Sequence, residues 1–115
     1  MLGSKRVLIK KLKEINSQLT KNCFDCDKIN GNLFIRTRRE GDIFYPQKRS
    51  STSKLKKLFI NAKIPIADRD ARVILCTAEN DVVFVEGFGV DKRFAPDQNS
   101  KSICVIETSI IQRGY

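Results

Sequence analysis

Alternating apolar and polar positions predict several short strands along the chain. Two strand-like runs, Phe24–Ile29 and Leu33–Arg38, flank Asn30-Gly31-Asn32, and an Asn-Gly pair between such runs is a typical hairpin signal. Further strand-like runs follow in the last third of the chain: Val73–Thr77, Val82–Val85 and Ser102–Thr108. The first two of these are separated by Ala78–Asp81, whose composition is typical of turns, so a second hairpin is predicted there.

The clearest helix lies between these β-rich parts. Its apolar stripe at helical spacing consists of Leu55, Leu58, Phe59 and Ala62. Thr52 or Ser53 is the expected N-cap. Pro65 is expected to end the helix, because the residue before a proline is disfavoured in the α region. Lys56 and Lys57 point away from the apolar stripe, so the stripe is expected to dock on a core while these lysines stay in solvent.

Two segments give weaker signals. Residues 67–71 are expected to make one further helical turn, which projects Arg69 and, just beyond it, Arg72. Residues 1–21 mix apolar residues with lysines without a clean period. They are consistent with a strand leading into a turn at Asn16-Ser17 or with a weak helix.

The elements together predict the fold class. One helix cannot cover both faces of a sheet, so we expect an α+β fold, a small β-sandwich-like sheet domain with one main amphipathic helix. Gly87 and Gly89 bracket Phe88, which indicates a bend or a close backbone approach. The length of 115 residues is typical of a single domain.

Charge is concentrated in the middle of the chain. The whole sequence has a net charge of +9. Residues 36–72 hold eleven lysines and arginines against four carboxylates, a net charge of +7, whereas residues 73–115 hold four against six. Such a polarised distribution favours binding to a polyanion, because each neutralised phosphate releases condensed counterions. The alternative is a lysine-rich surface that is only solvated.

Several classes of function are excluded by what the sequence lacks. The chain contains no histidine, which excludes catalysis by histidine, catalytic triads built on histidine and histidine-ligated metal sites. It has no Walker loop, G-x-G-x-x-G or H-E-x-x-H motif. No window approaches the ~20 apolar residues of a membrane span, and the N-terminal residues do not resemble a secretory signal. We therefore expect a cytoplasmic protein without a membrane partner.

The cysteines and carboxylates are expected to be structural. Cys23 and Cys26 form a C-x-x-C, whereas Cys76 and Cys104 stand alone, so a second close pair for a zinc site is missing and no metal site is predicted. Aspartates beside the C-x-x-C disfavour a reactive thiolate. The acids near the arginines at 36–42 and 68–72 are interpreted as loop caps and local ion pairs rather than a catalytic carboxylate pair.

Several ordered motifs point to one family. They are R-T-R-R-E-G-D-I-F at 36–44, S-K-L-K-K-L-F-I-N-A-K-I-P at 53–65, Arg69-Asp70, F-D-C-D-K-I at 24–29 and V-E-G-F-G-V-D-K-R-F at 85–94. Together they resemble the C-terminal domain of bacterial tRNA(Ile)-lysidine synthetases, over about residues 23–108. A similar domain in the β subunit of phenylalanyl-tRNA synthetase is a β-sandwich of unusual topology, which agrees with the element count.

The resemblance implies a role in tRNA modification. The family's full enzyme is a ligase that uses ATP and Mg²⁺ to attach lysine to the wobble cytidine of tRNA(Ile), on an N-terminal domain with an S-G-G-x-D-S loop that this chain lacks. The chain is then expected to be an excised C-terminal fragment or a truncated relative, with residues 1–22 a linker or the end of a preceding domain and residues 23–115 the tRNA-binding domain. Its partners are expected to be tRNA(Ile), gripped near the acceptor stem, and the remaining domains of the parent. The chain by itself is expected to be neither an enzyme nor the holder of a cofactor.

The basic residues of the matching motifs are the candidate site. The RNA-facing surface is predicted to consist of Arg36, Arg38, Arg39, Lys54, Lys56, Lys57, Arg69 and Arg72. Lysines act as point charges toward phosphates, and arginines make bidentate contacts or stack. Arg39 beside Glu40, and Arg69 between two aspartates, are the arginines most open to local ion pairing.

Two alternatives to tRNA binding stay open. In the first, the domain is a structural or interdomain module, with Leu55, Leu58 and Phe59 docked inside the parent and the lysines merely solvated. In the second, it is a small enzyme built on Cys23 and Cys26. Retention of tRNA on a filter separates the first from tRNA binding, and thiol titration with metal analysis tests the second.

Overall fold

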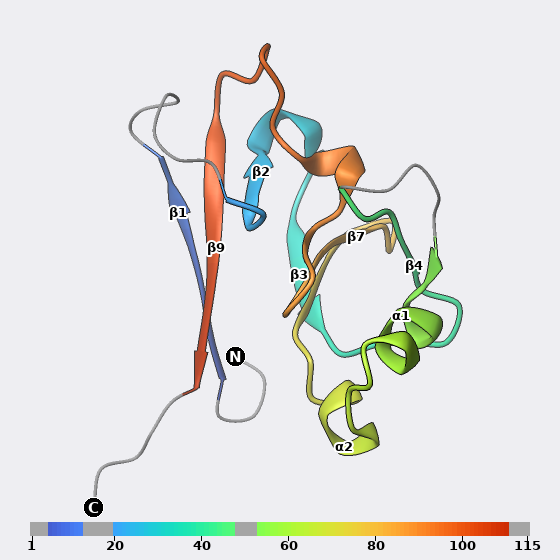
Figure 1. Cartoon of the computed structure of the whole chain (residues 1–115). Coiled ribbons are helices and arrows are strands. Elements are labelled where there is room, and N and C mark those ends of the chain that lie inside the picture. Colours follow the sequence, from blue (N-terminus) through green and yellow to red (C-terminus); the bar gives the residue numbers. More distant parts are fainter. Residues whose placement is uncertain (1–4, 13–19, 48–52, 111–115) are drawn as a thin grey trace, which may run out of the picture.

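The chain folds into short strands and short helices (Figure 1). The computed structural model describes residues 5–12, 20–47 and 53–110. Sheet A contains β1 (Lys5–Lys11), β9 (Ile103–Ile110) and β2 (Cys23–Asp25), in that order. Sheet B contains β3 (Leu33–Arg36), β6 (Ile74–Thr77), β7 (Val82–Val85) and β8 (Gly89–Val90), in that order. A small third sheet pairs β4 (Ile43–Phe44) with β5 (Ser53–Lys54). The helices are α1 (Leu55–Asn61), α2 (Ile66–Arg69) and the 3-10 turns η1 (Cys26–Lys28) and η2 (Lys92–Phe94).

Sheet B is the middle layer of the domain. Figure 1 shows sheet A on one side of it and α1 on the other. One core cluster joins Leu75 and Phe84 of sheet B to Phe24 and Ile106 of sheet A. A second cluster packs the other face of sheet B against α1. Side chains alternate between the two faces of a strand, so a strand covered on both faces is buried throughout, as the I-L-C-T of β6 and the V-V-F-V of β7 are.

An irregular pairing between β6 and β7 adjusts this alternation. Leu75 pairs with Phe84 and Cys76 pairs with Val82, so Val83 is an extra residue on β7. Beyond such a bulge, the residues of the strand that point to a given face of the sheet are shifted by one position. As a result Val83 and its neighbour Phe84 both belong to the core between the two large sheets.

Helix α1 docks through the predicted apolar stripe. Leu55, Leu58 and Phe59 are buried on it, and burying a side chain of this size contributes roughly 1.5–3 kcal/mol. Ala62, the last predicted member, is exposed and follows the helix as its C-cap. The N-cap prediction was wrong for Ser53, because Ser53 lies in β5 and Lys54 is the N-cap without a side-chain bond. The alternative cap, Thr52, lies outside the described residues.

The predicted hairpin around Asn30-Gly31 is wrong. The run that begins at Phe24 is a strand only through Asp25, and η1 follows it directly. Strand β2 pairs with β9, whereas β3 pairs with β6, so the two runs lie in different sheets. The second predicted hairpin is confirmed, because β6 and β7 pair antiparallel across the turn after Thr77.

The N-terminal segment of the described chain is a strand. Strand β1 pairs with β9 over seven residue pairs, from Lys5 with Ile110 to Lys11 with Cys104. Val7 packs against the core between the sheets, and Lys5 forms an ion pair of 2.8 Å with Glu86. Residues 5–11 therefore share a sheet with the part after residue 22, while the division of the chain at residue 22 stays a prediction.

The fold class is confirmed: mixed α and β, two antiparallel sheets packed face to face, and few helices. No helix within the described ranges is long and apolar enough to cross a membrane.

Candidate nucleic-acid interface

Arg36, at the end of β3, is held by a two-pronged ion pair. Its Nη1 and Nη2 each donate to one carboxylate oxygen of Asp42 at 2.8 Å, and Nη1 also donates to the carbonyl of Thr37 at 3.0 Å. The side chains of Arg36 and Asp42 are only 10% and 8% exposed. Much of the guanidinium is therefore occupied within the protein.

The ion pair shifts the pKa of each partner in the direction that favours its charged form. Burial alone raises the pKa of Asp42, but hydrogen bonds from Arg36 and from the backbone N–H of Arg39, with the charges of both arginines, lower it overall. The pKa of Arg36 is raised, first by its hydrogen bond to Asp42 and against the cost of burial. Both groups stay ionised at neutral pH, so the contact is a salt bridge.

Asp42 also connects the arginine-rich loop to α1. Its Oδ2 accepts a hydrogen bond from the backbone N–H of Arg39 at 2.8 Å. Its backbone carbonyl accepts from the N–H of Leu55, the first residue of α1, at 2.9 Å. Next to it, Ile43 pairs with Lys54 across the small sheet. One aspartate thus places the loop that carries Arg39 beside the start of the lysine-bearing helix.

Three further predicted arginines, Arg38, Arg69 and Arg72, bind nearby groups. Arg38 lies 3.7 Å from Asp70, and its Nε is buried without a hydrogen-bond partner among the described residues. The Nε of Arg69 donates to the carbonyl of Ile64 at 2.7 Å. Arg72 donates to the carbonyl of Glu86 at 3.3 Å. These contacts connect the end of β3 and the end of β7 to the turn around α2.

The remaining predicted cations are exposed. They are Arg39 in the loop after β3, Lys54 before α1, and Lys56 and Lys57 on α1. The exposure of Lys56 and Lys57 confirms the predicted helix orientation. The eight candidates therefore divide into four exposed cations and four arginines with contacts inside the domain.

The prediction of local ion pairs is confirmed, although the partners differ from those expected. Arg36 and Arg38, rather than Arg39 and Arg69, hold the ion pairs found in this region within the described residues. The turn over residues 39–42, closed by the N–H of Asp42 on the carbonyl of Arg39 and with Gly41 at φ of 88°, returns Asp42 to Arg36.

The cysteines are free thiols. Cys23, Cys76 and Cys104 are buried, and Cys26 is half-buried. Burial, together with the nearby Cys26, raises the pKa of Cys104 to about 12, which keeps this thiol protonated and unreactive at neutral pH. In the described part of the chain, no three Cys, Asp or Glu residues gather where they could hold a metal ion.

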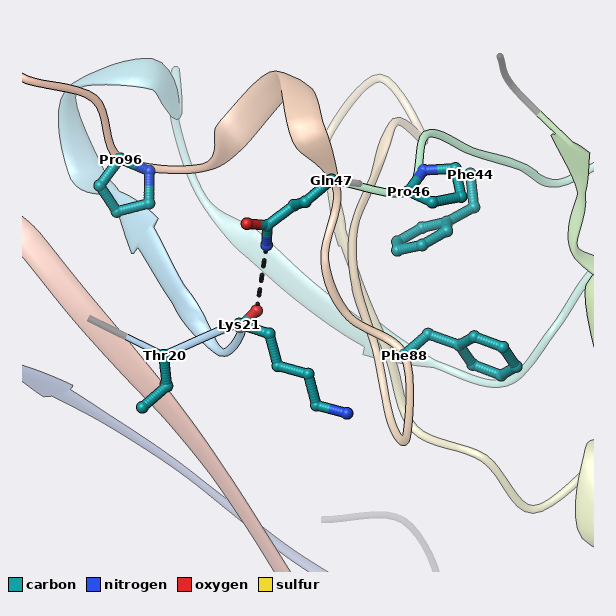
Figure 2. A pocket seen from close by; sticks show the side chains of 7 residues that line it. All are labelled: Thr20, Lys21, Phe44, Pro46, Gln47, Phe88 and Pro96. Carbon is teal, nitrogen blue, oxygen red and sulfur yellow. Dashed lines mark hydrogen bonds between the residues drawn. The ribbon is translucent and has the colours of Figure 1, made fainter. Parts of the chain in front are cut away.

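Sequence reasoning missed a pocket beside β8. It has a volume of about 520 Å³ and is shown in Figure 2. Its lining residues are Thr20, Lys21, Phe44, Pro46, Gln47, Phe88 and Pro96. They come from separate segments of the chain, and the only local signal was the pair of glycines around Phe88. Those glycines do make the expected bend and close approach, with φ of 90° and 95°.

Residues 33–107 match the family model described as the TilS substrate C-terminal domain. This range contains β3 to β8, both α-helices and most of β9. The chain belongs to this family. The resemblance to the C-terminal domain of tRNA(Ile)-lysidine synthetases is thereby confirmed.

Curated relatives carry the same name. The tRNA(Ile)-lysidine synthase of Caldanaerobacter subterraneus subsp. tengcongensis is 38% identical over 84 residues, which are 73% of this chain and 18% of the relative. That of Clostridium acetobutylicum is 35% identical over 102 residues, 87% of this chain and 22% of the relative. The chain spans about a fifth of the length of these relatives.

Solved structures share the fold of the TilS C-terminal domain. A crystal structure of a TilS C-terminal domain matches 96% of this chain and 87% of its own, with a TM-score of 0.80 and 23% identity. An N-terminal fragment of the phenylalanyl-tRNA synthetase β subunit from Pyrococcus horikoshii matches 91% of this chain and 29% of its own, with a TM-score of 0.61 and 15% identity. Both similarities support the fold, including the predicted likeness to the phenylalanyl-tRNA synthetase domain.

Proposed function

We propose that this domain binds tRNA(Ile) near the acceptor stem and positions it for a parent enzyme that ligates lysine to the wobble cytidine. The observation that carries the proposal is the placement of exposed cations on two neighbouring elements of a TilS C-terminal domain. Arg39 and Lys54 are exposed on segments that Asp42 ties together. Family membership and the names of the relatives support a tRNA substrate.

The chemistry of this surface suits phosphate backbone rather than base edges. A-form RNA presents phosphates and a shallow minor groove, so proteins recognise it mostly by shape and charge. Lys54, Lys56 and Lys57 supply mobile point charges. Arg36, through its ion pair with Asp42, and Arg38, beside Asp70, hold the loop that carries Arg39 in place for phosphate contact.

Catalysis is assigned to the rest of the parent. The relatives named above are about five times longer than their match to this chain. ATP and Mg²⁺ suit a phosphate-binding loop of the S-G-G-x-D-S type, which this sequence lacks. The domain therefore contributes affinity and orientation to the reaction, which lower the entropic part of its barrier.

The test replaces Lys54, Lys56 and Lys57 together by Ala. We expect weaker binding of tRNA(Ile) and a log–log salt dependence whose slope falls by up to about 3, because each phosphate contact contributes roughly 0.7–0.9 to it. Fluorescence anisotropy with labelled tRNA over a salt series measures both quantities.

A matched control removes the same charge from β1 and from the segment that leads into β9. Lys10, Lys11 and Lys101 are exposed on the β1 and β9 side of the domain, and their triple Ala variant should keep most of the salt slope. Equal losses in both variants would show that binding depends on net charge alone and not on this surface. An unchanged slope in a folded Lys54/Lys56/Lys57 variant would contradict the assignment of α1.

A second candidate function, an interdomain module, is favoured by exposed apolar residues. Ile60 on α1 and Ile66 on α2 are 48% and 72% exposed, and exposed apolar residues that gather into a patch mark docking sites. In this case they would dock on another domain of the parent. Absence of tRNA retention on filters at roughly physiological salt, where specific phosphate contacts still bind, would favour this function.

A further inference from the structure

The pocket beside β8 is built around one rigid aromatic ring. Figure 2 shows Phe88 on the same side of the pocket as Phe44 and Pro46, with Pro96 on the opposite side, beyond Gln47. Phe88 packs edge-on against Phe44 at 6.4 Å and tilted against Phe59 at 5.5 Å. Because Phe88 is only half-buried, part of its ring remains available to the pocket.

The backbone around the pocket is fixed by short contacts. The N–H of Val90 donates to the carbonyl of Lys21 at 2.7 Å. A Cβ at Gly89 would lie 2.7 Å from the same carbonyl, so only glycine lets the two segments approach this closely. The pocket is therefore formed before any ligand arrives, which limits the entropy lost on binding.

Gln47 presents one oriented acceptor. Its Nε2 donates to the carbonyls of Lys21 at 3.2 Å and Val90 at 2.8 Å. Both neighbours are acceptors, so the amide cannot be flipped without losing both bonds. The Oε1 accepts no hydrogen bond from any residue in the described ranges, and Figure 2 shows it turned toward the Pro96 side.

Lys21 supplies a cation on the Gly87 side of the pocket, and Figure 2 shows its side chain extending away from the Gln47 amide. Lys21 is exposed, and its Nζ donates to the carbonyl of Gly87 at 3.2 Å. An ammonium has three donors, so two remain for an anionic group. The pocket thus combines aromatic and proline walls, one fixed acceptor and one cation, and its volume lies within the ~300–1,000 Å³ range of small-ligand sites.

We infer that this pocket takes one unpaired nucleobase of the bound RNA. The base would lie against Phe88 and the prolines, with an N–H of its Watson–Crick edge donated to Gln47 Oε1 and its phosphate on Lys21. A base in a duplex has that edge engaged, so the pocket selects single-stranded nucleotides. The inference rests on the proposed function, since it names which part of the RNA the domain reads besides the phosphates.

The test compares a blunt RNA duplex with the same duplex carrying a single-stranded 3′ extension. Stacking of one base on an aromatic ring strengthens binding, so the extension should raise affinity for the full chain about tenfold, which corresponds to about 1.4 kcal/mol. A 2-aminopurine in the extension should change its fluorescence on binding, which reports insertion of the base directly.

Two variants target the pocket without emptying the core. Gln47→Ala removes the fixed acceptor, and Phe88→Leu keeps apolar volume but removes the ring face. Both should abolish the tenfold advantage of the extension and leave the affinity for the blunt duplex unchanged. Thermal unfolding of each variant checks that the fold is retained.

The outcomes distinguish failure of this inference from failure of the proposed tRNA-binding function. If both duplexes bind the wild-type chain equally, the pocket inference is overturned and phosphate binding stands. If the extension helps equally in the wild type and in either folded variant, the base lies elsewhere and the inference is likewise overturned. If neither duplex binds, the proposed function fails and the inference fails with it. The first two outcomes leave the Lys54/Lys56/Lys57 test of the proposed function unaffected.

Discussion

At the residue scale, the ion pair between Arg36 and Asp42 shows how a predicted binding residue also holds the fold. The pair is nine-tenths buried, and Asp42 further accepts a backbone hydrogen bond at Arg39. Removing one partner of such a pair leaves an uncompensated buried charge, which costs more than the pair itself contributes.

Asp42→Asn should lower the free energy of unfolding by about 3 kcal/mol at neutral pH. The pKa of Asp42 is lowered in the folded state from its ordinary value of 3.8. Its contribution to stability is therefore present above that pH and is lost as the pH falls through the lower folded-state value. Urea unfolding between pH 7 and pH 2 should show the gap between the two proteins closing only in acid.

Glu79→Gln is the matched control, because Glu79 is exposed in the turn between β6 and β7. It should change stability by less than about 0.5 kcal/mol. A gap for Asp42→Asn that stays constant down to pH 2 would show that the carboxylate's charge is not what the fold uses.

At the element scale, the turn at Gly87-Phe88-Gly89 joins β7 to β8 and carries the pocket ring. Gly89 combines a φ of 95° with the close approach to the carbonyl of Lys21. Gly31 has a similar φ of 88°, but a Cβ added there would have no atom within 4 Å. The two glycines thus separate the cost of backbone conformation from the cost of a steric clash.

Gly89→Ala should destabilise the domain clearly more than Gly31→Ala does. The left-handed conformation costs an L-residue roughly 1–2 kcal/mol at either position. At Gly89 the clash with backbone adds to this cost, because the Lys21 carbonyl cannot move without losing its bond to Val90. Chemical denaturation of both variants measures the difference, and equal losses would contradict the steric part of the argument.

The sequence predicts elements well where their partners are close along the chain. The hairpin of β6 and β7 and the apolar stripe of α1 follow from local patterns. The Asn30-Gly31 signal failed because β2 is stabilised by pairing with the distant β9, and long-range pairing overrides turn propensity. The sequence also predicted ion pairs near the arginines at 36–42, although not which residues form them. It could not predict the pocket, because the residues that line it come from segments that are distant in the sequence and meet only in the fold.

At the scale of the whole molecule, β1 closes one edge of sheet A. It pairs with β9 along its full length and contributes Val7 to the core. Lys5 reaches Glu86 and the carbonyl of Ala71, which connects this strand to the segment after α2. The predicted tRNA-binding domain begins at residue 23. These contacts support including residues 5–11 in the same folded domain.

Deletion of residues 1–12 should lower the free energy of unfolding by at least about 2 kcal/mol, the order of burying one aliphatic side chain. Urea denaturation of the full and shortened chains measures this loss. Lys5→Ala alone serves as the control for the ion pair and should cost less. Equal stability of the full and shortened chains would instead support a domain boundary near residue 22.

In sheet B, strands β6 and β7 are covered on both faces, by sheet A on one side and by α1 on the other, whereas Phe34 and Ile35 of β3 are exposed. Loops, strand ends and the outer surface of α1 lie outside this packed centre, so substitutions there leave the interior packing untouched. In a fold of this kind, surface residues can differ between proteins while the packing of the sheets and of α1 stays the same. This explains how a fragment of a phenylalanyl-tRNA synthetase with 15% identity can share the fold at a TM-score of 0.61.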